Sequence, residues 1–135
     1  MPTETPHYNG RPKLLLVDDD ESARLTLAMA LTRQGFAVST AEDGIAALAL
    51  LAENGFDWVI SDLRMPGMTG IELASHLQLQ HPGVRCILVS AFAMADELTE
   101  LGVVACLEKP VDAEQLFALL SCNGNSAADA SLRQP

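Results

Sequence analysis

The sequence has few basic residues. Lys and Arg account for 8 of its 135 residues, against 18 Asp and Glu, and the formal net charge is -10 at pH 7. The lysines are Lys13 and Lys109 alone. Nucleic acids are bound mainly through clusters of Lys and Arg that contact phosphates. The charge balance therefore argues against a nucleic-acid-binding surface on this chain.

Long apolar runs are also missing. The longest, residues 45–52, is far shorter than the roughly 20 residues that a membrane-spanning helix needs. The amino terminus lacks the apolar core of a secretory signal. Three cysteines, Cys86, Cys106 and Cys122, form neither a CxxC pair nor a metal-ligand spacing. We interpret them as reduced thiols that act as small apolar residues, and we expect a cytoplasmic protein with no membrane contact.

Apolar runs and helical patterns alternate along most of the chain. Residues 1–12 are rich in Pro and Gly and are interpreted as a flexible leader, and the small polar residues of 122–135 as a disordered tail or a linker. The expected strands cover residues 13–17, 36–40, 56–61, 84–90 and 103–107. The expected helices cover residues 22–34, 43–54, 71–80, 93–101 and 112–120, the last with Asp112 as its N-cap.

Five strand–helix units in succession indicate one α/β domain over residues 13–121. They require a doubly wound five-stranded parallel sheet with helices on both faces. The strands are continuous apolar runs, as expected for strands buried on both sides. In such sheets a site forms at the carboxyl ends of the strands, where the strand order reverses.

Charged and polar residues stand at these strand ends, namely Asp18–Asp20, Asp62, Ser90 and Lys109. Taken singly, each has a simple structural explanation, such as the helix N-cap that we expect Asp20 to be. Taken together, they need a counter-charge, because two carboxylates about 4 Å apart repel by about 4 kcal/mol at an effective dielectric constant of about 20. Lys109 and a hard divalent cation would supply it, best Mg²⁺, with Mn²⁺ possible. A carboxylate held there is suited to attack phosphorus.

Four segments carry a family resemblance: VDDDES, WVISDLRMPGMTGIEL, ILVSAF and CLEKPVD. They resemble the receiver domain of bacterial two-component response regulators, over about residues 13–121. The resemblance implies a flavodoxin-like fold with strand order 2-1-3-4-5. It also implies a signalling switch rather than an enzyme, phosphorylated on Asp62 by a histidine kinase or a phosphotransfer protein.

The resemblance also implies a metal site. Asp19 and Asp62 would bind Mg²⁺ directly, the backbone carbonyl of Arg64 would add a third ligand, and Asp18 would act through water.

Further roles follow for the phosphoryl group. Ser90 would donate a hydrogen bond to it, and the small Ala91 would leave room for its entry. Lys109 would pair with the acyl phosphate, and the Lys109–Pro110 peptide bond would be cis.

The sequence departs from the family pattern in two regions. Cys106 stands where the family usually has a Tyr or Phe that turns inward on activation, so the usual aromatic switch is absent. The interval from Ser90 to Lys109 is shorter than usual by about one helical turn. The helix expected over 93–101 should therefore be short or displaced. In the family, homodimers usually form through this helix together with the strand expected over 103–107 and the helix expected over 112–120, so that mode of dimerisation is in doubt here.

Two residues bear on the lifetime of the phosphoryl group. Arg64 and Phe92 stand where the family flanks the water that hydrolyses it. A bulky Phe92 would obstruct that water, so we expect slow self-dephosphorylation.

Several alternative interpretations of the sequence stay open or conflict with particular residues. The chain could be a stand-alone receiver or a piece of a longer regulator, and an inert pseudo-receiver scaffold is a rival interpretation. An aspartyl-nucleophile phosphatase would need a second Asp where Arg64 stands. A flavin or nucleotide site would need a Gly-rich loop after the first strand, where the sequence is DDDE.

Overall fold

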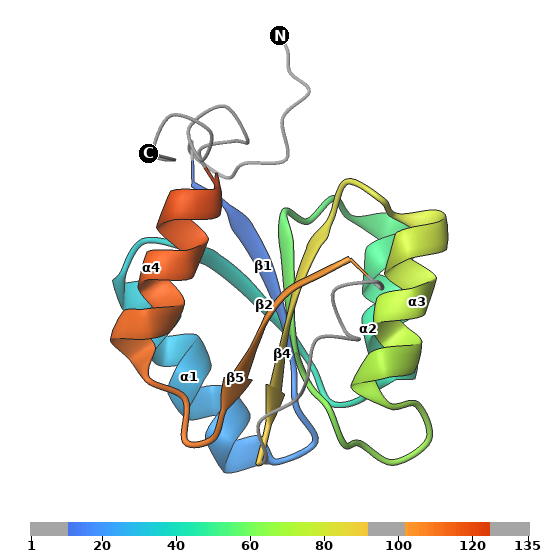
Figure 1. Ribbon diagram of the computed structural model, residues 1–135, viewed down its shortest axis with the longest axis horizontal. Helices are drawn as coiled ribbons and strands as arrows, with labels where there is room; N and C mark the ends of the chain where they lie inside the picture. The colour runs from blue at the N-terminus through green and yellow to red at the C-terminus, as the bar shows by residue number, and fades with distance from the viewer. Residues whose placement is uncertain (1–10, 92–101, 125–135) are drawn as a thin grey trace, which may run out of the picture.

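The computed structural model describes residues 11–91 and 102–124 as a sheet with helices on both sides (Figure 1). Its strands are β1 (Lys13–Val17), β2 (Ala37–Ala41), β3 (Trp58–Asp62), β4 (Arg85–Ser90) and β5 (Val103–Glu108). Its helices are α1 (Glu21–Arg33), α2 (Gly44–Glu53), α3 (Gly70–Gln80) and α4 (Ala113–Gly124).

The five strands are parallel and lie in the order β2-β1-β3-β4-β5, as predicted. The chain moves from β1 outward to β2, and then crosses back to place β3 on the other side of β1. This reversal creates a crevice at the carboxyl ends of β1 and β3. The registers Leu14 with Trp58 and Val17 with Ser61 align the two strands so that their last residues are neighbours.

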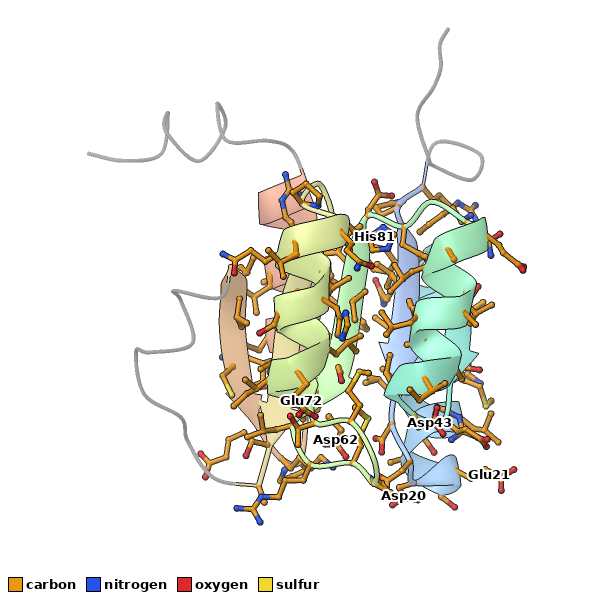
Figure 2. All side chains as sticks on the ribbon, turned by 90° about the vertical axis from the view of Figure 1, so that its right-hand side faces the viewer. Asp20, Glu21, Asp43, Asp62, Glu72 and His81 are labelled. Carbon is orange, nitrogen blue, oxygen red and sulfur yellow. The ribbon has the colours of Figure 1, made fainter. Side chains whose placement is uncertain are left out.

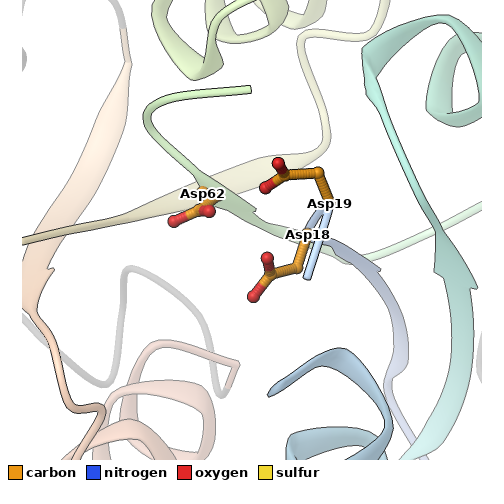
Figure 3. A group of neighbouring side chains, drawn as sticks. All are labelled: Asp18, Asp19 and Asp62. Carbon is orange, nitrogen blue, oxygen red and sulfur yellow. The ribbon is translucent and has the colours of Figure 1, made fainter. Parts of the chain in front are cut away.

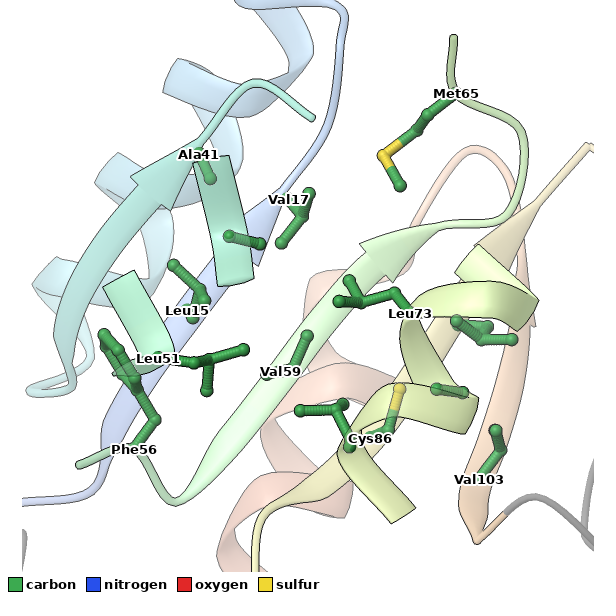
Figure 4. Packing of buried hydrophobic residues seen from close by; sticks show 14 of the residues in the cluster. Leu15, Val17, Ala41, Leu51, Phe56, Val59, Met65, Leu73, Cys86 and Val103 are labelled. Carbon is green, nitrogen blue, oxygen red and sulfur yellow. The ribbon is translucent and has the colours of Figure 1, made fainter. Parts of the chain in front are cut away.

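Side chains alternate across the sheet and build one core on each face. On the face covered by α2 and α3, Leu15 and Val59 pack with Leu51 and Leu73 (Figure 4). On the opposite face, α1 and α4 cover a second cluster that includes Trp58. The central strands β1, β3 and β4 are buried on both faces, which explains their mainly apolar sequences. The edge strands β2 and β5 are only partly buried.

Most predicted element boundaries agree with the structure to within two residues. The strand predicted to begin at residue 56 begins at Trp58. The preceding Asp57 already bonds to the neighbouring strand, since its backbone N–H donates to the carbonyl of Lys13 (2.8 Å). Helix α4 continues past residue 121, where the polar tail was expected to begin, and ends at Gly124. Gly is a poor helix former, and the helix ends at this glycine.

Some predictions fall on residues outside the described ranges. These are residues 1–10 of the leader expected over 1–12, the helix expected over 93–101, and residues 125–135 of the tail expected over 122–135. Within the described residues, no helix is both long enough and apolar enough to cross a membrane.

Candidate functional site

The loop after β1 brings three consecutive aspartates to the carboxyl edge of the sheet. Asp20 is the N-cap of α1, as predicted, and its carboxylate accepts hydrogen bonds from the backbone N–H groups of Ser22 (3.1 Å) and Ala23 (3.5 Å). The Asp18 carboxylate accepts from the backbone N–H of Asp20 (2.9 Å). Asp20 is thus occupied with the helix, while Asp18 and Asp19 remain for the crevice.

Asp62 is the last residue of β3 and only 8% exposed. The strand holds it through its register with Val89, and the next residue, Leu63, donates its backbone N–H to the carbonyl of Val89 (2.8 Å). The β3–α3 loop, residues 63–69, then turns back, and the N–H of Gly70 donates to the carbonyl of Leu63 (2.8 Å). A Cβ on Gly70 would lie 2.5 Å from the carbonyl oxygen of Asp62. Only glycine permits this close approach.

Lys109 lies just beyond β5, and its Nζ is 2.8 Å from Oδ1 of Asp62. The Lys109 backbone N–H donates to the Ser90 carbonyl (2.8 Å), so the residue is tied to the end of β4. The following Lys109–Pro110 peptide bond is cis. The Asp112 carboxylate caps α4 by accepting from the backbone N–H of Glu114 (3.0 Å), as predicted.

The three carboxylates of Asp18, Asp19 and Asp62 converge on one space (Figure 3). Each offers an oxygen, and these oxygens lie within 4.8 Å of one another. Asp62 is buried, Asp18 half-buried and Asp19 exposed, so the cluster opens toward solvent on one side. Hard oxygen donors so close together fit a small divalent cation such as Mg²⁺.

The cluster shifts the protonation equilibria of its members. Burial raises the pKa of Asp62, the Asp18 carboxylate raises it further, and Lys109 lowers it without cancelling the rise. Burial alone would lower the pKa of Lys109, but the carboxylates of Asp62, Asp18 and Asp19 together outweigh it, and that pKa is raised. Asp62 is therefore a carboxylate whose ionised form is disfavoured until more positive charge arrives.

The other predicted site residues lie around this cluster. Ser90 is buried (3% exposed) at the end of β4. It follows Val89, the residue that lies opposite Asp62 in the sheet, and is followed by the exposed Ala91. Arg64 is exposed in the β3–α3 loop. Cys106 is half-buried in β5 and packs against the core under α3. Phe92 lies outside the described residues, so slow self-dephosphorylation stays a prediction.

A cleft of about 700 Å³ opens beside the cluster, between α1 and the start of α4. Asp18, Asp62 and Lys109 line one part of it, and the rest is mainly apolar, with Leu27 on α1 and Val111 before α4. A side chain of another molecule could reach Asp62 through this cleft.

Two further residues, Arg24 and Gly70, shape the site and were not predicted from the sequence. Arg24 donates from Nη1 to the carbonyl of Asp18 (2.8 Å) and so fixes the first acidic residue. Its position one turn into the helix after the aspartates was the available signal. Gly70 is the second. A glycine at the start of a helix indicates that another part of the chain comes close, but the sequence does not show that this part is the Asp62 backbone.

The fold and the site together define a class of protein. It is a doubly wound parallel α/β domain. At the point where the strand order reverses, it carries a cluster of carboxylates suited to a cation, with a lysine beside them. A family model for the response regulator receiver domain matches residues 14–121. The chain therefore belongs to the response regulator receiver domain family, a family of signalling switches.

Two curated proteins illustrate the relationship. The chain is 40% identical over 107 residues to the transcriptional regulatory protein GlrR of Escherichia coli K12. This match covers 77% of this chain but only 24% of GlrR. It is 30% identical over 107 residues to the sporulation initiation phosphotransferase F of Bacillus subtilis, with 77% of this chain and 86% of that protein covered. The chain thus spans about a quarter of the length of the first relative and most of the second.

A solved structure supports the same assignment. The response regulator TrrA of Thermotoga maritima, in complex with Mg²⁺ and beryllium fluoride, has a TM-score of 0.75 and is 27% identical. The match covers 82% of this chain and 96% of that chain.

Proposed function

We propose that the chain is a cytoplasmic signalling switch that accepts a phosphoryl group on Asp62 from a histidine kinase or a phosphotransfer protein. The observation that carries the proposal is the convergence of three carboxylates within 4.8 Å, one of them 2.8 Å from Lys109. Such an arrangement is electrostatically costly unless a cation completes it. Family membership supports the same conclusion.

In the proposed reaction, a carboxylate oxygen of Asp62 attacks phosphorus. An O–P bond forms, the bond from phosphorus to the donor breaks, and its electron pair leaves with the donor group. Lys109 would pair with the phosphoryl oxygens. The buried hydroxyl of Ser90 and the small Ala91 would receive the phosphoryl group at the end of β4.

Mg²⁺ fits the donor set of the pocket. Asp19 and Asp62 would hold it directly, with the backbone carbonyl of Arg64, and Asp18 would hold it through water. When bound, the cation would neutralise negative charge on the phosphoryl oxygens. Mn²⁺ has the same preference for oxygen ligands.

The test is phosphorylation by acetyl phosphate, followed by intact-protein mass spectrometry. With Mg²⁺ the wild type should gain the mass of one phosphoryl group, and with EDTA it should not. Asp62→Asn should gain nothing under either condition. Asp112→Asn is the matched control, because it removes a carboxylate from the same edge of the sheet while Asn still caps α4.

A wild type that stays unmodified with Mg²⁺ would contradict the proposal and support the pseudo-receiver interpretation. An adduct that persists in Asp62→Asn would place the acceptor elsewhere.

A further inference from the structure

A groove runs between α2 and α3, on the face of the molecule away from α1 and α4. It has a volume of about 550 Å³. We call it the α2–α3 groove, and its principal lining residues are Ile45, Met68, Ile71, Glu72, His76 and Leu79. None of these residues belongs to the carboxylate cluster.

The groove exposes two large aliphatic side chains, Ile45 and Leu79, while its other apolar residues Met68 and Ile71 also pack against the core. Helix α3 turns Leu73 and Leu77 toward the sheet, so Ile71 and Leu79 lie on another side of the helix. Leu79 is 82% exposed, and Ile45 at the start of α2 is 65% exposed. Single exposed leucines are normal on a protein surface. Here the exposed residues line one concave surface, which is typical of a binding site.

The floor of the groove is held in a defined position. Met68, from the β3–α3 loop, packs where a side chain of residue 44 would otherwise lie: a Cβ on Gly44 would be 2.7 Å from the Met68 Sδ. The loop is fixed again at Gly70 by its contact with the Asp62 backbone. The groove is therefore largely preformed, which lowers the entropic cost of binding.

The charged residues of the two helices that border the groove are acidic, although the adjoining β3–α3 loop carries the exposed Arg64. Neither α2 nor α3 contains a Lys or an Arg. Asp43, the N-cap of α2, and Glu72, in the first turn of α3, lie at the same end of the two helices as Asp62 (Figure 2). A partner that matches this surface needs an apolar ridge with basic residues beside it.

We propose that the α2–α3 groove docks an amphipathic helix of a partner protein, with aliphatic residues on one face and Lys or Arg on the flanks. The groove follows α3 from Ile71 to Leu79 and is bordered by Ile45 of α2, which suits a helix whose side chains at i, i+3, i+4 and i+7 form the ridge. A second copy of the chain is a poorer occupant, because the same acidic residues would face each other across a symmetric contact. The inference does not depend on phosphorylation of Asp62.

The test uses a synthetic helical peptide of about 18 residues, with leucines in a helical ridge and Lys and Arg on both sides of it. The ¹⁵N-labelled full chain is titrated with the peptide and followed by two-dimensional NMR. Chemical-shift changes should map to α2, α3 and the β3–α3 loop. A peptide of the same composition with the ridge scrambled should bind about tenfold more weakly or worse.

Variants of exposed leucines provide the matched comparison. Leu79→Glu should weaken binding of the ridged peptide about tenfold or more, whereas Leu25→Glu, at a 48% exposed position on α1, should leave it unchanged. Both positions are exposed, so both variants are expected to fold. Asp62→Asn protein should bind the peptide like the wild type, so this inference and the proposed function can fail separately.

Three outcomes would overturn the inference. Equal binding of the scrambled peptide would show attraction by net charge alone. An unchanged affinity in Leu79→Glu would place the peptide elsewhere. Concentration-dependent dimerisation seen by analytical ultracentrifugation and abolished by Leu79→Glu would make the groove an interface between copies of this chain.

Discussion

Asp62 combines burial, a nearby cation and nearby carboxylates in one side chain. Its exposure is 8%, Lys109 lies 2.8 Å from its Oδ1, and Asp18 and Asp19 approach from the loop after β1. Burial and the negative charge of Asp18 disfavour ionisation, and Lys109 only partly compensates. The ionised Asp62 side chain thus lowers the stability of the folded protein, and such destabilising groups are typical of functional sites.

This cost predicts that Asp62→Asn stabilises the metal-free protein at neutral pH. Because the pKa of Asp62 is raised on folding, its charge opposes folding above that pKa. We expect a gain in the free energy of unfolding on the order of 1 kcal/mol, a common scale for point mutations. The gain should fade as the pH falls through the folded-state pKa and vanish below the unfolded-state pKa, where wild-type Asp62 is neutral in both states. Urea unfolding in EDTA at several pH values measures it.

Asp112→Asn serves as the control for this measurement. Asp112 is exposed and caps α4, and Asn caps a helix about equally well, so the variant should not reproduce the pH-dependent gain. Destabilisation by Asp62→Asn at neutral pH would mean that the pair with Lys109 contributes more than burial and repulsion cost.

The β3–α3 loop is the element that joins the two sites of the molecule. It begins beside Asp62, carries Met68 into the α2–α3 groove and ends at the first residue of α3. A capping box at Thr69 and Glu72 starts the helix: the Thr69 hydroxyl accepts from the N–H of Glu72 (3.1 Å), and the Glu72 carboxylate accepts from the N–H of Thr69 (2.9 Å). Local hydrogen bonds and one glycine contact thus fix the path of the loop.

Gly70→Ala should therefore destabilise the protein and impair the site. The added Cβ would lie 2.5 Å from the Asp62 carbonyl oxygen and 3.0 Å from the Cα of Leu63, and both are backbone atoms that cannot rotate away. We expect a loss of about 1–3 kcal/mol in the free energy of unfolding, the usual cost of overpacking. Chemical denaturation measures this loss, and the yield of the acetyl phosphate adduct reports on the site.

Gly83→Ala is the matched control, since nothing lies within 4 Å of a Cβ at that position. Its stability should stay close to that of the wild type. If Gly70→Ala were equally stable, the loop would be adaptable at Gly70 and the close approach would not constrain it.

The whole molecule carries a formal charge of -10, to which the carboxylate cluster contributes. A cation that binds the folded state alone stabilises it by mass action. Two effects of Mg²⁺ must therefore be separated: binding at the cluster and general screening of a negative chain.

Mg²⁺ should raise the thermal unfolding midpoint more than NaCl of equal ionic strength. At about 100-fold excess over its dissociation constant, a ligand contributes about 2.7 kcal/mol. Asp19→Asn should lose most of the Mg²⁺-specific shift, because it removes an exposed ligand without disturbing the sheet. Glu53→Gln removes one charge at the far end of α2 and should keep the shift. Equal losses in both variants would indicate screening, with no site at the cluster.

Much of the fold was predictable because its signals are local. Most strands are short, mainly apolar runs and each helix has its own pattern and cap, so the order of the elements could be predicted along the chain. The parallel arrangement then followed from the alternation of strands and helices. Boundaries were less predictable, because a strand end depends on pairing with distant segments: β3 begins at Trp58, two residues after its predicted start.

The site divides in the same way. That Asp18, Asp19, Asp62 and Lys109 stand at strand ends is a property of the sequence, because a residue that follows a strand lies at its carboxyl end. Their separations are not. The 2.8 Å contact of Lys109 with Asp62 depends on the packing of β5 against β4 and of β4 against β3.

The sequence by itself therefore determined the class of fold, the edge of the sheet that carries the site and the kinds of side chain found there. Only the tertiary structure decided which carboxylates come within ligand distance, that Gly70 must accommodate the Asp62 backbone, and that Ile45 and Leu79 line one groove. The physical reason is that secondary structure follows from interactions between residues close in the chain. Ligand distances, close backbone contacts and grooves instead depend on how separate elements pack, and no local pattern records that packing.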